Sequence, residues 1–153
     1  MDIIEEKIKK FKFELIWSLQ RNETLTFDIN ANHANKKGFV YLWVAEKENF
    51  EKKIVYVGMT KRELAEKNGR LLKEHQSGFR NTKSGIKNAL MISKIPIEYT
   101  IAIYCRHAET KLYFDIEEVS LCATDEQFFL NEFKRYNQPL MNGIRDVNKY
   151  NFQ

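Results

Sequence analysis

The sequence predicts an α/β domain of the α+β type, in which a small antiparallel sheet of three or more strands is flanked by helices. Two neighbouring runs, Phe39–Val44 and Lys53–Gly58, are short and rich in β-branched and aromatic residues. A third run, Pro96–Arg106, alternates apolar and polar residues with the period of a strand. Apolar residues elsewhere recur at helical spacing, which indicates helices that cover the sheet.

The first two runs are expected to pair as an antiparallel hairpin. The charged stretch Glu46–Glu51 lies between them and suits a longer solvent-exposed loop. The Pro96–Arg106 run is expected to add to this hairpin as a further strand. These three segments therefore form the predicted sheet.

The chain before the sheet is expected to hold one helix and a connection. Apolar residues in Ile3–Leu19 are close to helical spacing, which predicts an amphipathic helix over this whole range. Residues Arg21–Lys37 are polar and mixed, and are expected to form a connection with a short strand near Leu25–Ile29.

The helices that follow the hairpin are predicted from periodicity and capping residues. A strongly cationic helix is expected after Gly58 and a second, short one over Ser84–Lys94. A helix is predicted over Asp125–Asn137, with Thr124 as its N-cap and Gln127 completing a capping box. The segment between these regions, Ala108–Ala123, fits either a helix or a strand.

Length and composition indicate one globular domain. The chain has 153 residues, of which 43% are hydrophobic and 30% charged, and this balance supports an independent core. Residues 1–37 are expected to pack as a helix and connection on a core formed by residues 38–153. Cys105 and Cys122 do not form a metal-binding pair and are expected to be buried thiols. The chain start does not resemble a signal peptide, and no run is long enough for a membrane span, so a cytoplasmic protein is expected.

Charge is distributed unevenly along the chain. Residues Lys36–Leu90 contain thirteen Lys or Arg and six Glu, whereas Ala108–Glu132 contains seven acids and one Lys. A basic stretch attracts the phosphate backbone of nucleic acid, and an acidic one can concentrate a divalent cation. Two solvated faces of an ordinary domain would explain the same pattern, so charge alone does not predict a function.

Five motifs in order resemble those of the GIY-YIG nuclease family. Gly-Phe-Val-Tyr ends at Tyr41, and Tyr-Val-Gly begins at Tyr56. An Arg and a His follow, and Glu126 then begins a run, Glu-Gln-Phe-Phe-Leu-Asn-Glu-Phe, that is similar to the family's glutamate helix. Gln-Pro-Leu-Met-Asn, which ends at Asn142, matches the closing asparagine. The resemblance covers Gly38–Gly143.

This resemblance implies a metal-dependent DNA endonuclease and assigns roles to six residues. Tyr41 or Tyr56 would deprotonate or position the attacking water, with the two phenols facing each other across the hairpin. Arg70 would contact the scissile phosphate, and His75 would accept a proton from a tyrosine or hold its hydroxyl. Glu126 would bind Mg²⁺, or Mn²⁺ in its place, because one carboxylate together with phosphate and water is enough for a hard cation. The sixth residue, Asn142, would support the site by hydrogen bonding.

Some residues depart from the family pattern and leave alternatives open. Arg70 and His75 are five positions apart, whereas family members place them about one helical turn apart, so Arg62 or Lys73 could contact the phosphate instead. Glu117, Glu118 and Glu132 are competing carboxylates for the metal. Basic side chains around the second strand and the cationic helix are candidates for phosphate contacts: Lys61, Arg62, Lys73, Arg80, Lys83 and Lys87. The remaining histidines and the tryptophans are expected to be structural: His33, His107, Trp17 and Trp43.

The predicted function is therefore hydrolysis of DNA phosphodiester bonds by an endonuclease of restriction, mobile-element or repair type. The alternative is a non-catalytic nucleic-acid-binding module that keeps the fold and has lost cleavage, which the Arg70 to His75 spacing favours. Cutting both strands would require two sites, so a symmetric homodimer is the simplest route to it. Residues Met1–Lys37 are additional to the motif region and could position DNA or mediate this contact.

Overall fold

The structure is a computed structural model that describes residues 2–19, 33, 35–64 and 83–153. Its helices and strands follow one another along the chain in the order α1 (Ile3–Lys10), β1 (Glu14–Leu19), β2 (Phe39–Glu46), β3 (Lys53–Thr60), α3 (Lys83–Ile92), β4 (Thr100–His107), β5 (Thr110–Tyr113), β6 (Glu117–Ser120), α4 (Cys122–Lys134) and the short 3-10 helix η2 (Val147–Lys149).

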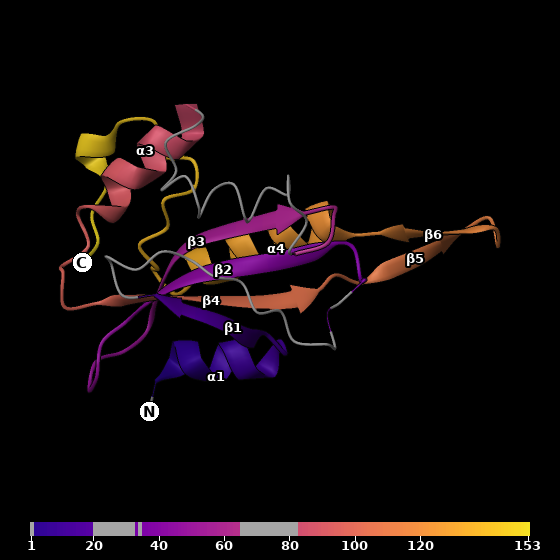
Figure 1. The fold of residues 1–153 in the computed structure, drawn as a ribbon, viewed down its shortest axis with the longest axis horizontal. Coiled ribbons are helices and arrows are strands. Elements are labelled where there is room, and N and C mark those ends of the chain that lie inside the picture. The colour runs from indigo at the N-terminus through magenta and orange to yellow at the C-terminus, as the bar shows by residue number, and fades with distance from the viewer. Residues whose placement is uncertain (1, 20–32, 34, 65–82) are drawn as a thin grey trace.

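The main sheet has four antiparallel strands in the order β1-β4-β2-β3 (Figure 1). The predicted hairpin is confirmed, because β2 pairs with β3 along its length. The predicted third strand is β4, which begins at Thr100 and pairs with the other side of β2. The sheet therefore agrees with the predicted fold class, and β3 is left at an outer edge.

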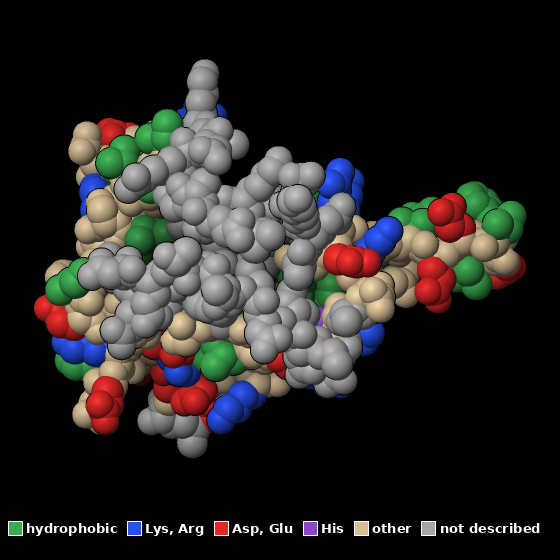
Figure 2. Space-filling model, viewed as in Figure 1, with side chains coloured by type: hydrophobic (Ala, Val, Ile, Leu, Met, Phe, Trp, Pro, Cys, Tyr) green, Lys and Arg blue, Asp and Glu red, His purple; other side chains and the backbone are tan. Residues whose placement is uncertain are grey.

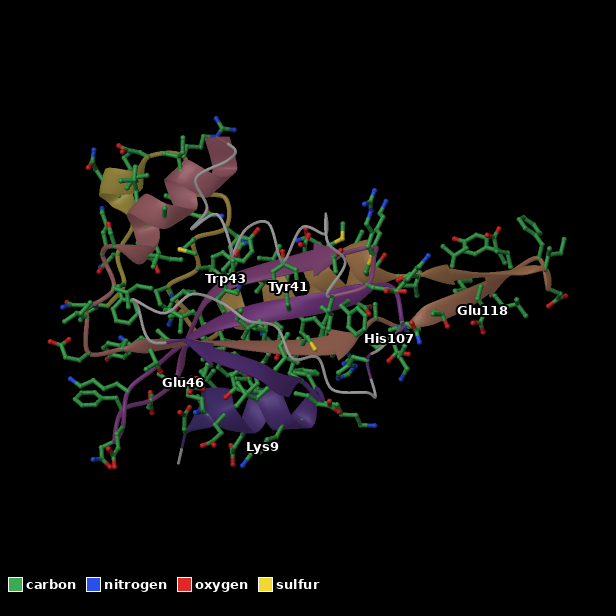
Figure 3. The ribbon with its side chains drawn as sticks, in the orientation of Figure 1. Lys9, Tyr41, Trp43, Glu46, His107 and Glu118 are labelled. Atoms are coloured by element: carbon green, nitrogen blue, oxygen red, sulfur yellow. The ribbon has the colours of Figure 1, made fainter. Side chains whose placement is uncertain are left out.

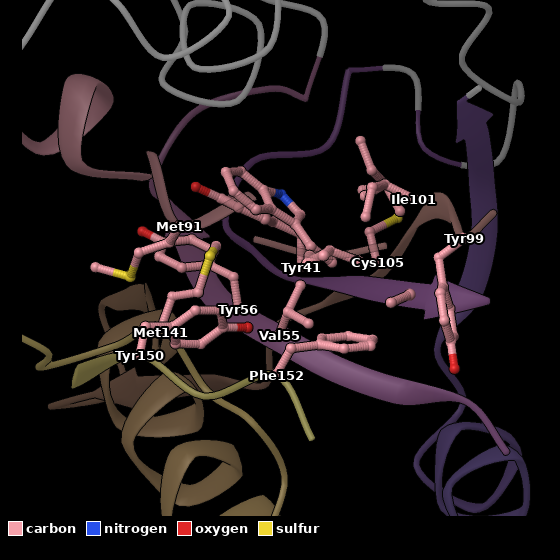
Figure 4. Packing of buried hydrophobic residues seen from close by; sticks show 14 of the residues in the cluster. Tyr41, Val55, Tyr56, Met91, Tyr99, Ile101, Cys105, Met141, Tyr150 and Phe152 are labelled. Carbon is pink, nitrogen blue, oxygen red and sulfur yellow. The ribbon is translucent and has the colours of Figure 1, made fainter. Parts of the chain in front are cut away.

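The two faces of the sheet carry separate apolar clusters, as expected when successive strand residues point to opposite sides. Tyr41 and Trp43 of β2 belong to one cluster, together with Met91 of α3 (Figure 4). Leu42 and Val44 belong to the other cluster, which also contains residues of α1 and α4. Figure 1 shows α4 behind β2 and β3. One face of the sheet thus carries both motif tyrosines, and the other packs on the glutamate helix.

The helix predicted over Ile3–Leu19 is wrong in its second half. Helix α1 ends at Lys10, and Lys12 has a φ of +59°, a left-handed conformation that cannot continue a helix. Residues Glu14–Leu19 instead form β1, which pairs with β4. The apolar spacing of this segment fits a helix, but hydrogen bonds from the open edge of β4 favour a strand. Spacing within the segment could not reveal that edge.

The prediction for the start of the glutamate helix is also wrong. Helix α4 begins at Cys122 after Leu121, which has no side-chain capping hydrogen bond. The N–H of Asp125 already donates to the carbonyl of Leu121, so Thr124 is inside the first turn and no capping box forms. The Asp125 carboxylate accepts instead from the N–H of Glu109, at 2.9 Å.

The segment that fitted either a helix or a strand forms a separate hairpin. Strands β5 and β6 pair only with each other and project beyond the main sheet (Figure 1). The predicted short helix over Ser84–Lys94 is confirmed as α3. The cationic helix expected after Gly58 lies largely outside the described residues, as does the strand expected near Leu25–Ile29.

Two further expectations concern cysteines and membrane spans. Cys105 and Cys122 are free and buried, as predicted. Burial raises the pKa of the Cys105 thiol to about 12. Within the described part of the chain, none of the helices has the length and apolar character needed to cross a bilayer.

Candidate active site

Tyr41 and Gly58 lie directly opposite each other on β2 and β3. The Tyr41 ring packs across the strand onto Gly58, and a Cβ added to that glycine would lie only 2.5 Å from two ring carbons. A side chain at this position would therefore displace the tyrosine. The glycine of the Tyr-Val-Gly motif thus provides the space in which the Tyr41 ring lies.

The second motif tyrosine lies diagonally from the first. Tyr56 pairs with Trp43, and the centroids of the Tyr41 and Tyr56 rings are 6.3 Å apart. The expectation that the two phenols face each other across the hairpin is therefore wrong in register, because the partner of Tyr41 is Gly58. Both rings still lie on one face of the sheet. Tyr41 is fully buried, whereas Tyr56 keeps 8% of its surface exposed.

Trp43, the strand partner of Tyr56, packs directly on the Tyr56 ring. Its ring centroid lies 4.4 Å from that of Tyr56, and its side chain is fully buried. Figure 3 shows Trp43 and Tyr41 along the same strand. The predicted packing role of Trp43 is thus seen in the structure, and the Tyr56 ring has two aromatic neighbours, Trp43 and Tyr41.

Side-chain amides from the segment after α4 form hydrogen bonds with backbone groups on the outer edge of β3. The Asn142 side-chain oxygen accepts from the N–H of Val57 at 3.0 Å, and its amide nitrogen donates to the carbonyl of the same residue at 2.7 Å. Gln138 accepts from the N–H of Ile54 at 2.8 Å. Val57 lies between Tyr56 and Gly58, so Asn142 binds the backbone of the motif itself. The Gln138 contact was not foreseen, although this residue opens the motif that ends at Asn142.

Glu126 lies on the stripe of α4 that faces the sheet. This stripe contains Cys122, Phe129 and Phe133, which are buried, and Glu126 itself is half-buried. Residues at these spacings share one helix face. Phe129 and Phe133 pack on the face opposite the tyrosines. Glu126 is in the first half of α4, which runs behind β2 and β3 in Figure 1.

The competing carboxylates lie elsewhere or have other partners. Glu117 and Glu118 are exposed on the projecting hairpin, and Figure 3 shows Glu118 far along the molecule from Tyr41. Glu132 is within 3.8 Å of the Lys7 ammonium and 3.2 Å of the Arg135 guanidinium. Among the described residues there is no group of three or more His, Cys, Asp or Glu side chains that could hold a metal.

The fold is similar to that of a solved nuclease. The structure of a mutant of bacteriophage T4 EndoII, a GIY-YIG endonuclease, superposes on this chain with a TM-score of 0.58 at 18% sequence identity. The match covers 85% of this chain and 94% of that one. The chain has a GIY-YIG fold. No protein-family model and no curated protein matches its sequence.

In this GIY-YIG fold, two exposed cationic segments meet beside the end of β3. The N–H of Gly38 donates to the carbonyl of Arg62 at 3.3 Å, which brings Lys36 and Lys37 next to Lys61 and Arg62. All four cationic residues are exposed. Lys36 and Lys37 were not among the predicted DNA-contacting residues, because only the fold places them beside the second strand.

Of the other basic residues predicted to contact phosphate, the structure describes only some. Arg70, Lys73, His75 and Arg80 lie outside the described residues. Of the other two, Lys83 begins α3, and Lys87 is half-exposed on the same helix. Their roles in phosphate binding stay predictions.

Two histidines expected to be structural hold the start of β2. His33 Nε2 lies 2.7 Å from a carboxylate oxygen of Glu14, and His107 Nε2 lies 3.0 Å from the carbonyl oxygen of Lys37. Both rings make edge contacts with Phe39. These contacts give each histidine a packing role.

Proposed function

We propose that this protein is an endonuclease that hydrolyses DNA phosphodiester bonds with the help of a divalent cation. The main support is the pair of motif tyrosines on one sheet face, with Tyr41 packed on Gly58 and the backbone between Tyr56 and Gly58 bound by Asn142. The GIY-YIG fold is independent support, because it rests on the path of the backbone and not on the identity of the motif residues.

The two tyrosines have different environments and would act differently. Tyr56 retains some exposed surface, so its hydroxyl is the better candidate to hold or deprotonate the attacking water. Tyr41 is fully buried beside it and would act as a positioning residue. Arg70 and His75 would complete the phosphate contact and the proton transfer, as the family resemblance implies. The exposed group Lys36, Lys37, Lys61 and Arg62 would bind the DNA backbone next to the site.

Glu126 is the carboxylate that would hold the cation. Its carboxylate is of the hard oxygen type that Mg²⁺ and Mn²⁺ prefer, and one such ligand would suffice together with phosphate and water. When bound, the cation would offset negative charge that develops on the phosphate. Helix α4, which carries Glu126, packs against β3, the strand that carries Tyr56, and this neighbourhood supports the role.

Cleavage of supercoiled plasmid in Mg²⁺ or Mn²⁺ tests this proposal. Wild-type protein should convert the plasmid to nicked or linear forms. Tyr56→Phe and Glu126→Ala should each lower the rate by at least about a hundredfold, since each removes a group that acts on the reacting atoms. Glu48→Ala is the matched control, because Glu48 is an exposed carboxylate in the β2–β3 loop. The substrate set should be broad, because a required recognition sequence would hide activity on a single plasmid.

A non-catalytic DNA-binding module is the second candidate function. The observation that favours it is the complete burial of Tyr41, since a catalytic hydroxyl needs access to water. This candidate predicts DNA binding with no cleavage across metals and sequences, and equal binding by wild type and Glu126→Ala. Metal-dependent cleavage that both Tyr56→Phe and Glu126→Ala abolish would exclude it.

A further inference from the structure

An open pocket lies at the end of the molecule away from the projecting β5–β6 hairpin. The β2–β3 loop, the start of β4 and the C-terminal residues meet at this end (Figure 1). Figure 2 shows apolar, basic and acidic side chains close together there. The pocket has a volume of about 380 Å³, which is within the size range of small-ligand sites. Its walls include residues from all three segments: Phe50, Glu51, Lys53, Pro96, Tyr99 and Phe152.

Three aromatic rings surround this pocket, and hydrogen-bonded turns hold two of them. The N–H of Phe50 donates to the carbonyl of Lys47 at 3.1 Å. The N–H of Tyr99 donates to the carbonyl of Pro96 at 3.1 Å. Tyr99 and Phe152 are buried and make an edge contact, with ring centroids 5.0 Å apart. Phe50 is 57% exposed, so its ring can stack with a ligand.

Lysine ammonium groups already lie over these rings. The Lys47 ammonium is 4.4 Å from the ring centroid of Phe50 and 5.7 Å from that of Tyr99. The Lys53 ammonium is 4.8 Å from the ring centroid of Phe152. A cationic ligand would have to compete with these ammonium groups for the same ring faces. The pocket therefore favours a ligand that combines a planar aromatic ring with a negative charge.

A nucleotide has both features. Its base stacks on aromatic side chains, and its phosphate binds lysine. The carboxylate of Glu51, which also lines the pocket, can accept a hydrogen bond from an N–H group on the edge of a base. In a duplex the bases are stacked on one another, so only an unpaired nucleotide can place its base in such a pocket.

The pocket is on the same side of the sheet as the motif tyrosines. Tyr99 and Phe152 belong to the apolar cluster that contains Tyr41 and Tyr56, and Figure 4 shows these rings in one view. Lys53 and Tyr56 are three residues apart on β3, a length of about 10 Å. This length equals about three nucleotide steps along a DNA strand. A strand that is cleaved beside Tyr56 can thus reach the pocket with a nearby base.

We propose that this pocket binds one unpaired nucleotide of the DNA strand, about three positions from the cleaved bond. The base stacks on Phe50, and Lys47 and Lys53 bind its phosphate. This inference rests on the proposed function, because that function supplies DNA as the ligand. It extends the proposed function by naming DNA with an unpaired base as the preferred substrate.

Fluorescence anisotropy without divalent cation tests the pocket, since binding is then measured apart from cleavage. Two labelled duplexes carry one extra nucleotide in one strand, and in one of them this nucleotide lacks its base. Wild type should bind the base-bearing bulge about tenfold more tightly than the abasic bulge, because one more base is stacked. Phe50→Ala should remove most of this preference and leave the affinity for a fully paired duplex unchanged. Phe128→Ala is the matched control, because Phe128 is 49% exposed on α4 and outside the pocket.

Adenosine monophosphate as a competitor distinguishes a free nucleotide from one held in a strand. If about 1 mM monophosphate displaces the base-bearing bulge from wild type more readily than from Phe50→Ala, the pocket also accepts free nucleotides. If the bulge preference persists and the monophosphate does not compete, the pocket requires a nucleotide within a strand. Both results support a nucleotide site.

Two results would overturn the proposal. One is equal affinity of wild type for the base-bearing and abasic bulges, and the other is a preference that Phe50→Ala retains. Failure of the proposed function would look different, because plasmid would stay uncleaved in Mg²⁺ or Mn²⁺ while the bulge preference persisted without metal. Plasmid cleavage with no bulge preference would refute the pocket alone.

Discussion

Gly58 determines where the Tyr41 ring can lie. A glycine in the middle of a strand weakens it, because the residue adds no packing and has more freedom to lose on folding. Here the missing side chain gives space to an aromatic ring from the paired strand, with 2.5 Å between the ring and an added Cβ. The cost in strand stability is offset by the buried tyrosine.

We expect Gly58→Ala to destabilise the protein by about 1–3 kcal/mol, the range for overpacking a filled core. The proposed nuclease activity should fall further than the loss of stability explains, because the displaced ring belongs to the proposed site. Urea unfolding and plasmid cleavage measure the two effects. In a Tyr41→Ala background the same change should cost much less, since the clashing ring is gone. Equal costs in both backgrounds would mean that the ring and the glycine are not coupled.

Tyr104 gives stability a dependence on alkaline pH. Its hydroxyl donates to the Glu46 carboxylate at 2.6 Å. Burial, with that hydrogen bond and the Glu46 charge, raises the pKa of Tyr104 above its ordinary value of 10.0. The folded chain therefore holds this proton more tightly than the unfolded chain, and the resulting stability is lost as the pH rises above that ordinary value.

Tyr104→Phe should lower the free energy of unfolding by about 1 kcal/mol at neutral pH, the usual contribution of such a hydrogen bond. The gap between wild type and variant should narrow as the pH rises past about 10, because only wild type loses the contribution of this proton. Urea unfolding at a series of pH values measures the gap. A constant gap would show that Tyr104 does not titrate with unfolding.

At the scale of elements, the edge of β3 is closed by side chains and not by another strand. Gln138 and Asn142 hydrogen-bond the backbone of Ile54 and Val57, and the N–H of Met141 donates to the carbonyl of Val55 at 2.7 Å. An open strand edge invites pairing with other chains. This segment therefore protects the strand that carries Tyr56 while it fixes the strand's position.

We expect Asn142→Ala to cost about 1–3 kcal/mol, because two backbone groups of Val57 lose their partner. The rate of DNA cleavage should fall together with the free energy of unfolding, since the affected backbone joins Tyr56 to Gly58. Thermal unfolding and cleavage rates check both effects. Asn148→Ala is the control, because Asn148 is exposed and its replacement should stay within about 0.5 kcal/mol. Similar losses in both variants would argue against a specific role for Asn142.

For the molecule as a whole, charge separates into a basic group beside β3 and an acidic hairpin. Lys36, Lys37, Lys61 and Arg62 meet through the contact between Gly38 and Arg62. Gly38 itself has a φ of +84°, and a Cβ there would lie 2.3 Å from the Ser120 hydroxyl at the base of the hairpin. This glycine thus brings the basic segment and the hairpin base close together.

Replacing Lys36 and Lys37 by Gln should weaken DNA binding and reduce its salt dependence. Each phosphate contact contributes about 0.9 to the slope of log affinity against log salt. The slope should therefore fall by up to about 1.8 for the double variant, with little change in sequence preference. Fluorescence anisotropy with labelled duplex measures this, and Lys9→Gln on α1 is the control. An unchanged slope would remove these two lysines from the DNA contact.

The sequence by itself determined the fold class, three strands of the sheet and the short helix α3. Strands β2, β3 and β4 are rich in residues that favour strands, or alternate strictly, and such patterns are local. The order of the motifs from Tyr41 to Asn142 predicted which residues belong to the candidate site. Strand propensity and motif order can both be read from the chain without knowing which strands pair with each other.

Only the tertiary structure decided what depends on distant partners. Leu15 and its neighbours form a strand because β4 has an open edge, and α4 starts early because its first turn packs against the hairpin base through Asp125 and Glu109. The register that pairs Tyr41 with Gly58, and not with Tyr56, comes from hydrogen bonds between strands. Pairing and edges are properties of two segments together, so the pattern within one segment cannot specify them.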